Sequence, residues 1–446
     1  MIDNNTLEVR QEVQGRTSVS PVELRRDIRR WDLVALLINV TVGAGILRLP
    51  SQVYKEAGAY SLPAFLICAA IIGLIVLCFA EVASRFSGTG GPYLYAHEAF
   101  GAAPAFMVGW LMWLTRLSGF ATLTAVFVEY LGYFWPGAAV GWWRAIVITG
   151  IVVSLTVINV VGVRESAITS TVLTVAKLIP LLLFVLVGVF FIRPGQFSFA
   201  ARPTFRPFSA AVFMLVYVFS GFEAVLVNSG EVREPSRNIP FALSLALGFS
   251  VLLFISIQVV CMGTLPGLGS STRPLADASS RFLGGIGPEI ISAGALAALL
   301  GTLHVVMLAC SRLPFAMAER GALPRILLRT HRRFQTPYVS ILVSAALVLA
   351  LSLSGTFIYL LTLSVITRVL VYGATCAALP VLRRRRTSLP ASFEAPAGSL
   401  VSTVSVLLCI GLLFSSGWRE GRDVAISGAI GLVLYLVVQY RRSIET

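Results

Sequence analysis

The chain has 446 residues, of which 57% are hydrophobic and only 13% are charged. Because soluble domains carry roughly a quarter charged residues, this composition excludes an ordinary soluble domain and indicates an integral membrane protein. The formal net charge of +14 does not predict nucleic acid binding, since the arginines cluster in short gaps between apolar runs. Basic residues at such places anchor membrane helices to an anionic lipid surface.

The apolar runs predict about twelve membrane-spanning helices, because roughly 17–25 apolar residues are needed to cross a bilayer. About thirty polar residues precede the first run, so we expect residues 1–30 to form a cytoplasmic tail rather than a cleavable signal. Residues 441–446 are expected to form a second short tail. We place the spans near residues 31–55, 62–86, 101–134, 142–162, 167–192, 207–230, 240–264, 286–318, 338–354, 356–381, 399–416 and 422–440.

Arginine clusters predict the orientation of these spans. With twelve spans, the clusters next to the first, eighth, tenth and twelfth all fall on one side, which should be the cytoplasm. Arg193, Arg202 and Arg206, between spans five and six, oppose this assignment. The majority predicts a multi-pass protein of the inner (cytoplasmic) membrane with both termini in the cytoplasm. The clustered residues are Arg25, Arg26, Arg29, Arg30, Arg320, Arg325, Arg329, Arg332, Arg333, Arg383, Arg384, Arg385, Arg386, Arg441 and Arg442.

Two of the apolar spans contain residues that disfavour a continuous helix. The first is Thr41-Val-Gly-Ala-Gly-Ile-Leu-Arg-Leu-Pro50, and the second is Val218-Phe-Ser-Gly-Phe-Glu-Ala224. Glycine and proline weaken helices, and a bilayer tolerates broken backbone only beside protein or a water-filled cavity. Paired interruptions in corresponding spans point to a transporter with inverted repeats and a shared binding site. A flexible kink without a ligand and a chance pairing are the alternatives.

Side chains for metal binding or catalysis do not form a recognisable pattern. The six cysteines lie within apolar runs and lack CxxC spacing, so they are expected to be small core residues. The three histidines, His97, His304 and His331, are far apart and lack ligand spacing. We therefore predict no metal site, no cofactor and no enzymatic activity.

Five motifs occur in order along the chain. They are Gly43-Ala-Gly-Ile46 with Leu49-Pro50, Gly90-Gly-Pro-Tyr-Leu-Tyr95 through Phe100-Gly101, Phe219-Ser-Gly-Phe-Glu223, Glu231-Val-Arg-Glu-Pro-Ser-Arg-Asn-Ile-Pro240 and Gly321-Ala-Leu-Pro324. Through these motifs the chain resembles the amino acid–polyamine–organocation (APC) transporters over nearly its whole length.

The resemblance implies an all-α membrane fold of the leucine-transporter type, with five helices repeated in inverted orientation and two further helices. On this view residues 31–192 and 207–381 form the two repeats, helices one and six are broken, and residues 399–440 form the two additional spans. It also implies that the protein works by alternating access.

By the same resemblance, the two breaks hold the backbone end of an amino acid. The amides of Gly43, Ala44 and Gly45 would bind the substrate carboxylate, where helix N-termini favour negative charge. Many relatives carry serine in place of Ala44, so a hydroxyl contact is missing here. The carbonyls of Thr41 and Ser220 would receive the substrate ammonium.

By the same resemblance, Tyr217 occupies the position where relatives place an aromatic gate over the substrate, and its ring would also attract an ammonium; simple packing is the alternative. The motif residues Ile46 and Phe219 complete the predicted substrate site. Glu223 is an acid within an apolar span, and such residues are functional candidates by default. It could couple protons or substrate to transport, or serve as a permanently bound structural carboxylate.

Three further cations lie within predicted spans. By resemblance, Lys177 places its ammonium where sodium-driven relatives hold a cation, which argues against sodium dependence; its proton could couple to conformation, or it could be a fixed tether. Arg116 could pair with Glu223, which we favour, or select an acidic group of the substrate, or snorkel or pair elsewhere. Arg48 could face the outer vestibule.

These observations predict a secondary active transporter for an amino acid or related amine, with proton-coupled symport favoured. A sodium-independent exchanger and a non-transporting amino acid sensor are the alternatives. The expected partners are the small-molecule substrate, protons and membrane lipid, without nucleic acid. The protein could be a monomer or a homodimer.

Overall fold

The computed structural model describes residues 28–86, 90–162, 167–227, 232–385 and 391–445. Within these residues the regular structure is helical, and β-type pairing is limited to one isolated bridge between Ile28 and Val232. Residues 1–27 of the predicted tail, with Arg25 and Arg26, lie outside the described residues. So do Glu231 of the fourth motif and Arg386.

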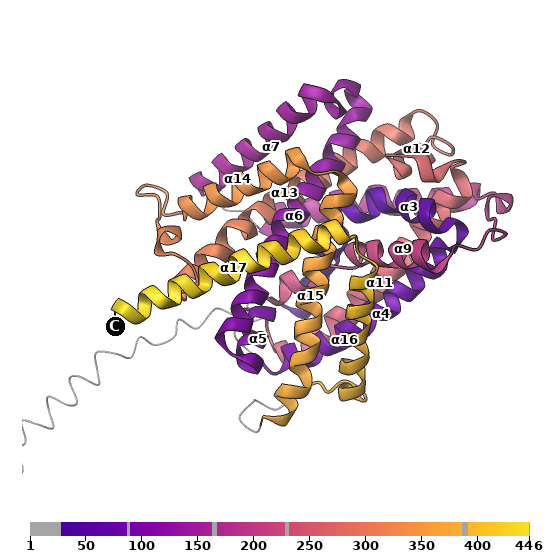
Figure 1. Cartoon of the computed structure of the whole chain (residues 1–446). Helices are drawn as coiled ribbons and strands as arrows, with labels where there is room; N and C mark the ends of the chain where they lie inside the picture. The colour runs from indigo at the N-terminus through magenta and orange to yellow at the C-terminus, as the bar shows by residue number, and fades with distance from the viewer. Residues whose placement is uncertain (1–27, 87–89, 163–166, 228–231, 386–390, 446) are drawn as a thin grey trace, which may run out of the picture.

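Within the described residues, helices follow one another along the chain, joined by turns and loops of varied length (Figure 1). Their bounds are α2 (Arg30–Thr41), α3 (Ala44–Ala57), α4 (Ser61–Ser84), α5 (Pro92–Phe100), α6 (Ala102–Phe134), α7 (Gly141–Val161), α8 (Ala167–Gly188), α9 (Phe205–Val218), α10 (Phe222–Leu226), α11 (Pro235–Thr264), α12 (Pro274–Ser279), α13 (Ile286–Glu319), α14 (Tyr338–Ser354), α15 (Phe357–Arg384), α16 (Gly398–Phe414) and α17 (Trp418–Glu445).

Each predicted span coincides with one of these helices or with a pair of them. Among the described residues, eight helical segments are long and apolar enough to cross a membrane. Three shorter apolar helices accompany them, at Lys177–Phe191, Tyr338–Ser354 and Gly398–Phe414. The prediction of an all-helical, multi-pass membrane protein is therefore confirmed.

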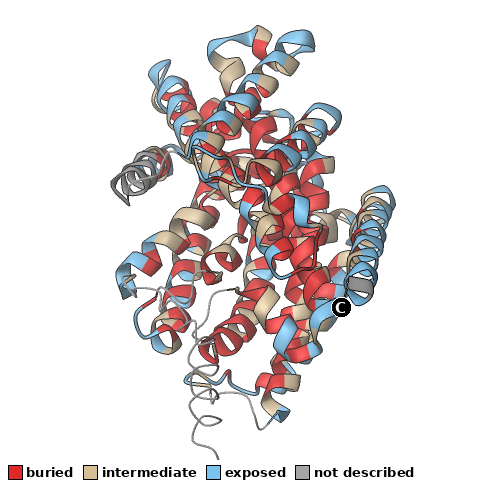
Figure 2. Ribbon diagram, turned by 90° about the vertical axis from the view of Figure 1, so that its left-hand side faces the viewer, coloured by how far each residue is buried: buried red, intermediate tan, exposed pale blue. Residues whose placement is uncertain are grey.

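Helix α6 lies at the centre of the bundle and α17 at its edge. In the most apolar stretch of α6, 83% of the residues are buried, against 11% in α17. Helix α6 contacts α13, α14 and α15, and Figure 2 shows buried residues concentrated in the interior of the bundle while the C-terminal helix is mostly exposed. Residues on the inner face of α6 are thus placed to line an internal site.

Both predicted helix breaks are present. Helix α2 ends at Thr41 and α3 begins at Ala44, and α9 ends at Val218 before α10 begins at Phe222. The second break turns at Gly221, whose φ of +110° is a conformation that residues with a Cβ rarely adopt. The glycines thus interrupt the helices for the reason that the sequence indicates.

The two breaks lie against each other. Helix α3 packs on α9, and α2 packs on α10. A Cβ added to Gly221 would lie 2.8 Å from the Val40 side chain and 3.0 Å from its carbonyl oxygen, and one added to Gly45 would lie 3.0 Å from the Tyr217 ring. This close approach needs glycine at position 221, because the Val40 backbone occupies the space of a side chain, whereas at Gly45 the nearest atoms belong to the Tyr217 and Val218 side chains.

We expect Gly221→Ala to destabilise the protein by more than about 2 kcal/mol, because the positive φ is strained for alanine and the new methyl group meets Val40. Thermal unfolding in detergent measures the loss. Gly150→Ala is the matched control: Gly150 is exposed on α7 with open space around it, and alanine favours a helix. Equal Tm values for the two variants would contradict the account of the break.

Candidate functional site

The two breaks open onto one internal cavity. Its wall combines both breaks with residues of α6, α13 and α15. Of the predicted site residues, those that line it are Thr41, Gly43, Ala44, Gly45, Arg116, Tyr217, Ser220 and Glu223.

Free backbone donors face the cavity at the first break. Ala44, Gly45 and Ile46 are the first residues of α3, and among the described residues their amides donate to no acceptor. We expected the Gly43 amide to be free as well, but it donates to the Thr41 carbonyl at 2.9 Å. The free amides of this break therefore begin at Ala44, one residue further along the chain than expected.

The carbonyl groups of the breaks stand beside these donors. The Thr41 oxygen accepts the Gly43 amide but retains a second lone pair, and the Ser220 carbonyl accepts no hydrogen bond among the described residues. Free amides of the first break and carbonyl groups of both breaks thus belong to residues that line the same cavity.

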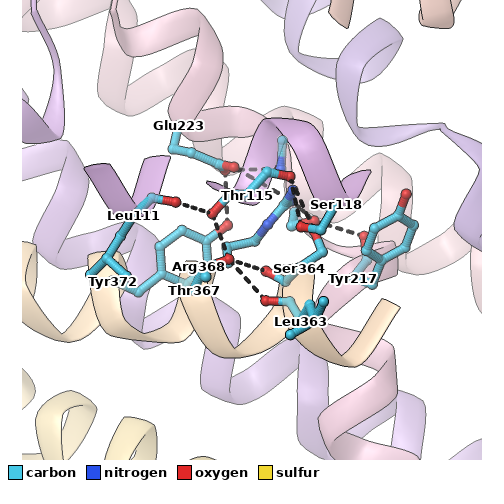
Figure 3. Close-up of polar contacts among 12 residues, drawn as sticks. Leu111, Thr115, Ser118, Tyr217, Glu223, Leu363, Ser364, Thr367, Arg368 and Tyr372 are labelled. Atoms are coloured by element: carbon cyan, nitrogen blue, oxygen red, sulfur yellow. Dashed lines mark hydrogen bonds and ion pairs between the residues drawn. The ribbon is translucent and has the colours of Figure 1, made fainter. Parts of the chain in front are cut away.

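The Glu223 carboxylate is held from three directions at the second break (Figure 3). Its Oε2 accepts the Gly221 amide at 2.9 Å and the Tyr372 hydroxyl at 2.8 Å, and its Oε1 lies 3.4 Å from Nη1 of Arg368. Such a carboxylate is compensated by charge and by hydrogen bonds. This geometry fits the structural alternative that we set beside a proton-carrying role.

Arg368 is the site residue that sequence reasoning missed. It lies near the middle of α15, binds the Ser220 hydroxyl, and places its guanidinium carbon 5.7 Å from the centre of the Tyr217 ring. An ionisable residue within an apolar span is a functional candidate by default, so the signal was present. Tyr372 lies one helical turn further along the same helix face.

The expected ion pair between Arg116 and Glu223 is wrong. Arg368 takes that place, and in the described part of the chain the Arg116 guanidinium makes no hydrogen bond or ion pair. The prediction failed because α15 presents a second arginine to the same carboxylate. Arg116 itself remains in the cavity wall, half-buried.

Two predicted substrate contacts point into the core instead. Ile46 is 1% exposed and does not line the cavity. Phe219 is equally buried and packs against Phe65 and Phe254, with ring centres 6.1 and 5.4 Å apart. The side chains of these motif residues stabilise the break, and the Ile46 amide has no acceptor among the described residues.

Lys177 reaches the first break, as predicted. Its ammonium donates to the Asn39 carbonyl near the C-terminal end of α2, and its side chain is buried. Among the described residues it has no carboxylate partner. It also lines a smaller pocket with Gly43 and Ala44, so a positive charge lies behind the free amides.

Ion-pair networks lie towards the two ends of the molecule. Arg48 on α3 pairs with Glu129 at 3.0 Å and donates to the Ser271 carbonyl at 2.8 Å. At the other end Glu81 accepts two hydrogen bonds from Arg383, at 2.6 and 2.7 Å, and one from Arg85 at 2.9 Å. These contacts tie α3 to α6 and α4 to α15.

Comparison with known proteins assigns the family. A family model described as amino acid permease matches residues 28–437. The chain belongs to the amino acid permease family. The resemblance to APC transporters is confirmed, and it extends over nearly the whole chain.

Several curated relatives of this permease come from Bacillus subtilis (strain 168). The chain is 27% identical to the methylthioribose transporter, over 94% of this chain and 95% of the relative. It is 24% identical to the branched-chain amino acid permease BcaP, over 94% of each chain, and 25% identical to the serine/threonine exchanger SteT, over 94% of this chain and 98% of the relative. The family and these relatives are permeases and transporters, not enzymes.

In this permease we expect Arg368→Gln to cost about 3–5 kcal/mol of stability, because it strands the buried Glu223 carboxylate. The double variant Glu223→Gln/Arg368→Gln should recover much of the loss, since no charge is then stranded. Arg116→Gln is the matched control and should cost less. Thermal unfolding of the wild type, the single variants Glu223→Gln and Arg368→Gln and the double variant measures the coupling, and additive effects of the two single substitutions would contradict the ion pair.

Proposed function

We propose that this permease is a secondary active transporter that moves an amino acid, or a related amine, by alternating access. The observation that carries the proposal is the meeting of two helix breaks at one cavity, with free amides and carbonyl acceptors beside each other. The family match and the names of the relatives, which include amino acid permeases and an exchanger, support the same substrate class.

In the proposed complex the substrate carboxylate binds the amides of Ala44, Gly45 and Ile46. The dipole of α3 favours a negative charge there. The substrate ammonium binds the Thr41 and Ser220 carbonyls. Tyr217 of the cavity wall covers the bound molecule.

The proposed architecture is a pair of inverted repeats, residues 31–192 and 207–381, followed by two helices within 399–440. The crossed packing of the breaks supports it, because α3 contacts α9 while α2 contacts α10. Such a pairing is expected when two broken helices run in opposite directions through a bilayer. Both termini would then lie in the cytoplasm.

We propose that protons, rather than sodium ions, drive uptake, and that Lys177 carries the coupling proton. Its ammonium already occupies the carbonyl at the end of α2, where a sodium ion would otherwise bind. Losing a proton there breaks no ion pair among the described residues, whereas the Glu223 carboxylate is held by Arg368 and Tyr372. Neutral Lys177 would hold the end of α2 less strongly, because its hydrogen bond is no longer charge-assisted. This weaker contact would couple the proton to movement of the helix.

The two ion-pair networks are placed to act as gates. Arg48 with Glu129 joins the helices at one end of the cavity, and Glu81 with Arg383 joins them at the other. Alternating access requires that these ends open in turn. Exchange of one amino acid for another is the second candidate, because a relative is named as an exchanger.

Purified permease in liposomes tests the proposal through uptake of labelled amino acids. An inward proton gradient should drive accumulation, a protonophore should abolish it, and replacement of sodium by potassium should leave it unchanged. Lys177→Met should lose the response to the proton gradient. Uptake that needs amino acid inside and ignores the gradient would favour the exchanger, and sodium-dependent uptake would contradict the role of Lys177.

A further inference from the structure

We propose that the cavity selects acidic amino acids, with Arg116 as the residue that binds the carboxylate of the substrate side chain. This inference rests on the proposed transport function and assigns its substrate class.

Arg116 belongs to the face of α6 that lines the cavity. Five residues of this helix line it, at positions 112, 115, 116, 119 and 123. These spacings of three and four residues mark one side of an α-helix. The half-buried Arg116 therefore presents its side chain to the same space as the free amides of the first break.

Two polar side chains of the same wall, Glu223 and Thr115, already have partners. The Glu223 carboxylate is engaged by the Gly221 amide, Tyr372 and Arg368. The Thr115 hydroxyl bonds to the Leu111 carbonyl and the Thr367 hydroxyl, both at 2.8 Å. The Glu223 charge attracts the Arg116 guanidinium, but among the described residues Arg116 makes no hydrogen bond or ion pair with a carboxylate.

Apolar side chains make up much of the remaining wall. Met112, Leu123, Val306 and Val371 contribute side chains to the cavity, and none of them can accept a hydrogen bond from an arginine with useful strength. A guanidinium among such side chains is free to bind an acceptor of the substrate. Its planar array of donors matches a carboxylate, which can accept two of them at once.

The charge of the cavity favours the same substrate class. The charged residues of its wall are Arg116, Arg368 and Glu223, so two positive charges and one negative charge leave a formal charge of +1. An acidic amino acid has a net charge of −1 and neutralises this site. A neutral amino acid leaves it unchanged, and lysine, arginine or a polyamine would add like charge to a low-dielectric cavity.

Ligand-induced thermal shifts of the purified permease test the inference, using pairs of near-identical shape: glutamate with glutamine, and aspartate with asparagine. A ligand that binds the folded state raises the Tm. We expect at least one acid to bind about tenfold or more tightly than its amide, as a charge-assisted bidentate contact implies. Lysine should give no shift.

Arg116→Gln should remove the difference between each acid and its amide, in thermal shift and in competition with labelled uptake. Arg312→Gln is the matched control, because Arg312 is exposed on α13 outside the cavity, and it should keep the wild-type preference. The paired-ligand comparison on the wild-type protein needs no variant, so the inference stays testable if Arg116→Gln fails to fold.

Binding and uptake of neutral or cationic amino acids in preference to acids would overturn the inference and leave the proposed transport function standing. So would an acid preference that survives in Arg116→Gln. Preference for hydroxyl-bearing neutral substrates would show that Arg116 donates to an uncharged acceptor, which also overturns it. Absence of any amino acid binding or transport would overturn both proposals.

Discussion

The binding of the Glu223 carboxylate is the constraint on which the rest of the site depends. The bilayer interior offers no donors or acceptors to a broken helix, so the chain must supply them. Glu223 accepts the amide of Gly221, two residues before it, and thereby holds the turn in its left-handed conformation. The same carboxylate accepts the Tyr372 hydroxyl and faces Arg368. One side chain thus stabilises the break and attaches it to a neighbouring helix.

That neighbouring helix, α15, contacts the second break and both of the ion-pair networks that lie towards the ends of the molecule. Near the start of α15, the ring centre of Phe357 lies 5.6 Å from the guanidinium carbon of Arg48. In the middle of the helix Arg368 pairs with Glu223 of the second break, and near its end Arg383 binds Glu81. At 1.5 Å per residue, Arg368 is about 17 Å along the helix from Phe357 and about 23 Å from Arg383. A tilt of this one helix would change the contacts at both ends of the cavity. Such a linkage would suit alternating access, in which the two ends open in turn.

The sequence predicted the helical spans and both breaks, because long apolar runs and glycines in them act locally. It did not predict which residues share a partner. We expected Glu223 to pair with Arg116 because they are conspicuous charges in two apolar spans. The ion pair of Glu223 with Arg368 depends instead on how α15 packs, and Arg368 is 145 positions away in the chain (368 − 223). The expected substrate contacts of Ile46 and Phe219 were missed for the same reason. A motif identifies which residues occur at the break, but the packing of the helices decides that the Phe219 side chain contacts Phe65 and Phe254.

A structure of the permease with bound glutamate would test the central claim, that the two breaks form one amino acid site, most directly. The account predicts the α-carboxylate within about 2.7–3.2 Å of the amides of Ala44, Gly45 or Ile46. It predicts the ammonium at the Thr41 and Ser220 carbonyls and the side-chain carboxylate on Arg116. A ligand bound outside this cavity, or one in it with the amides of α3 still free, would contradict the account.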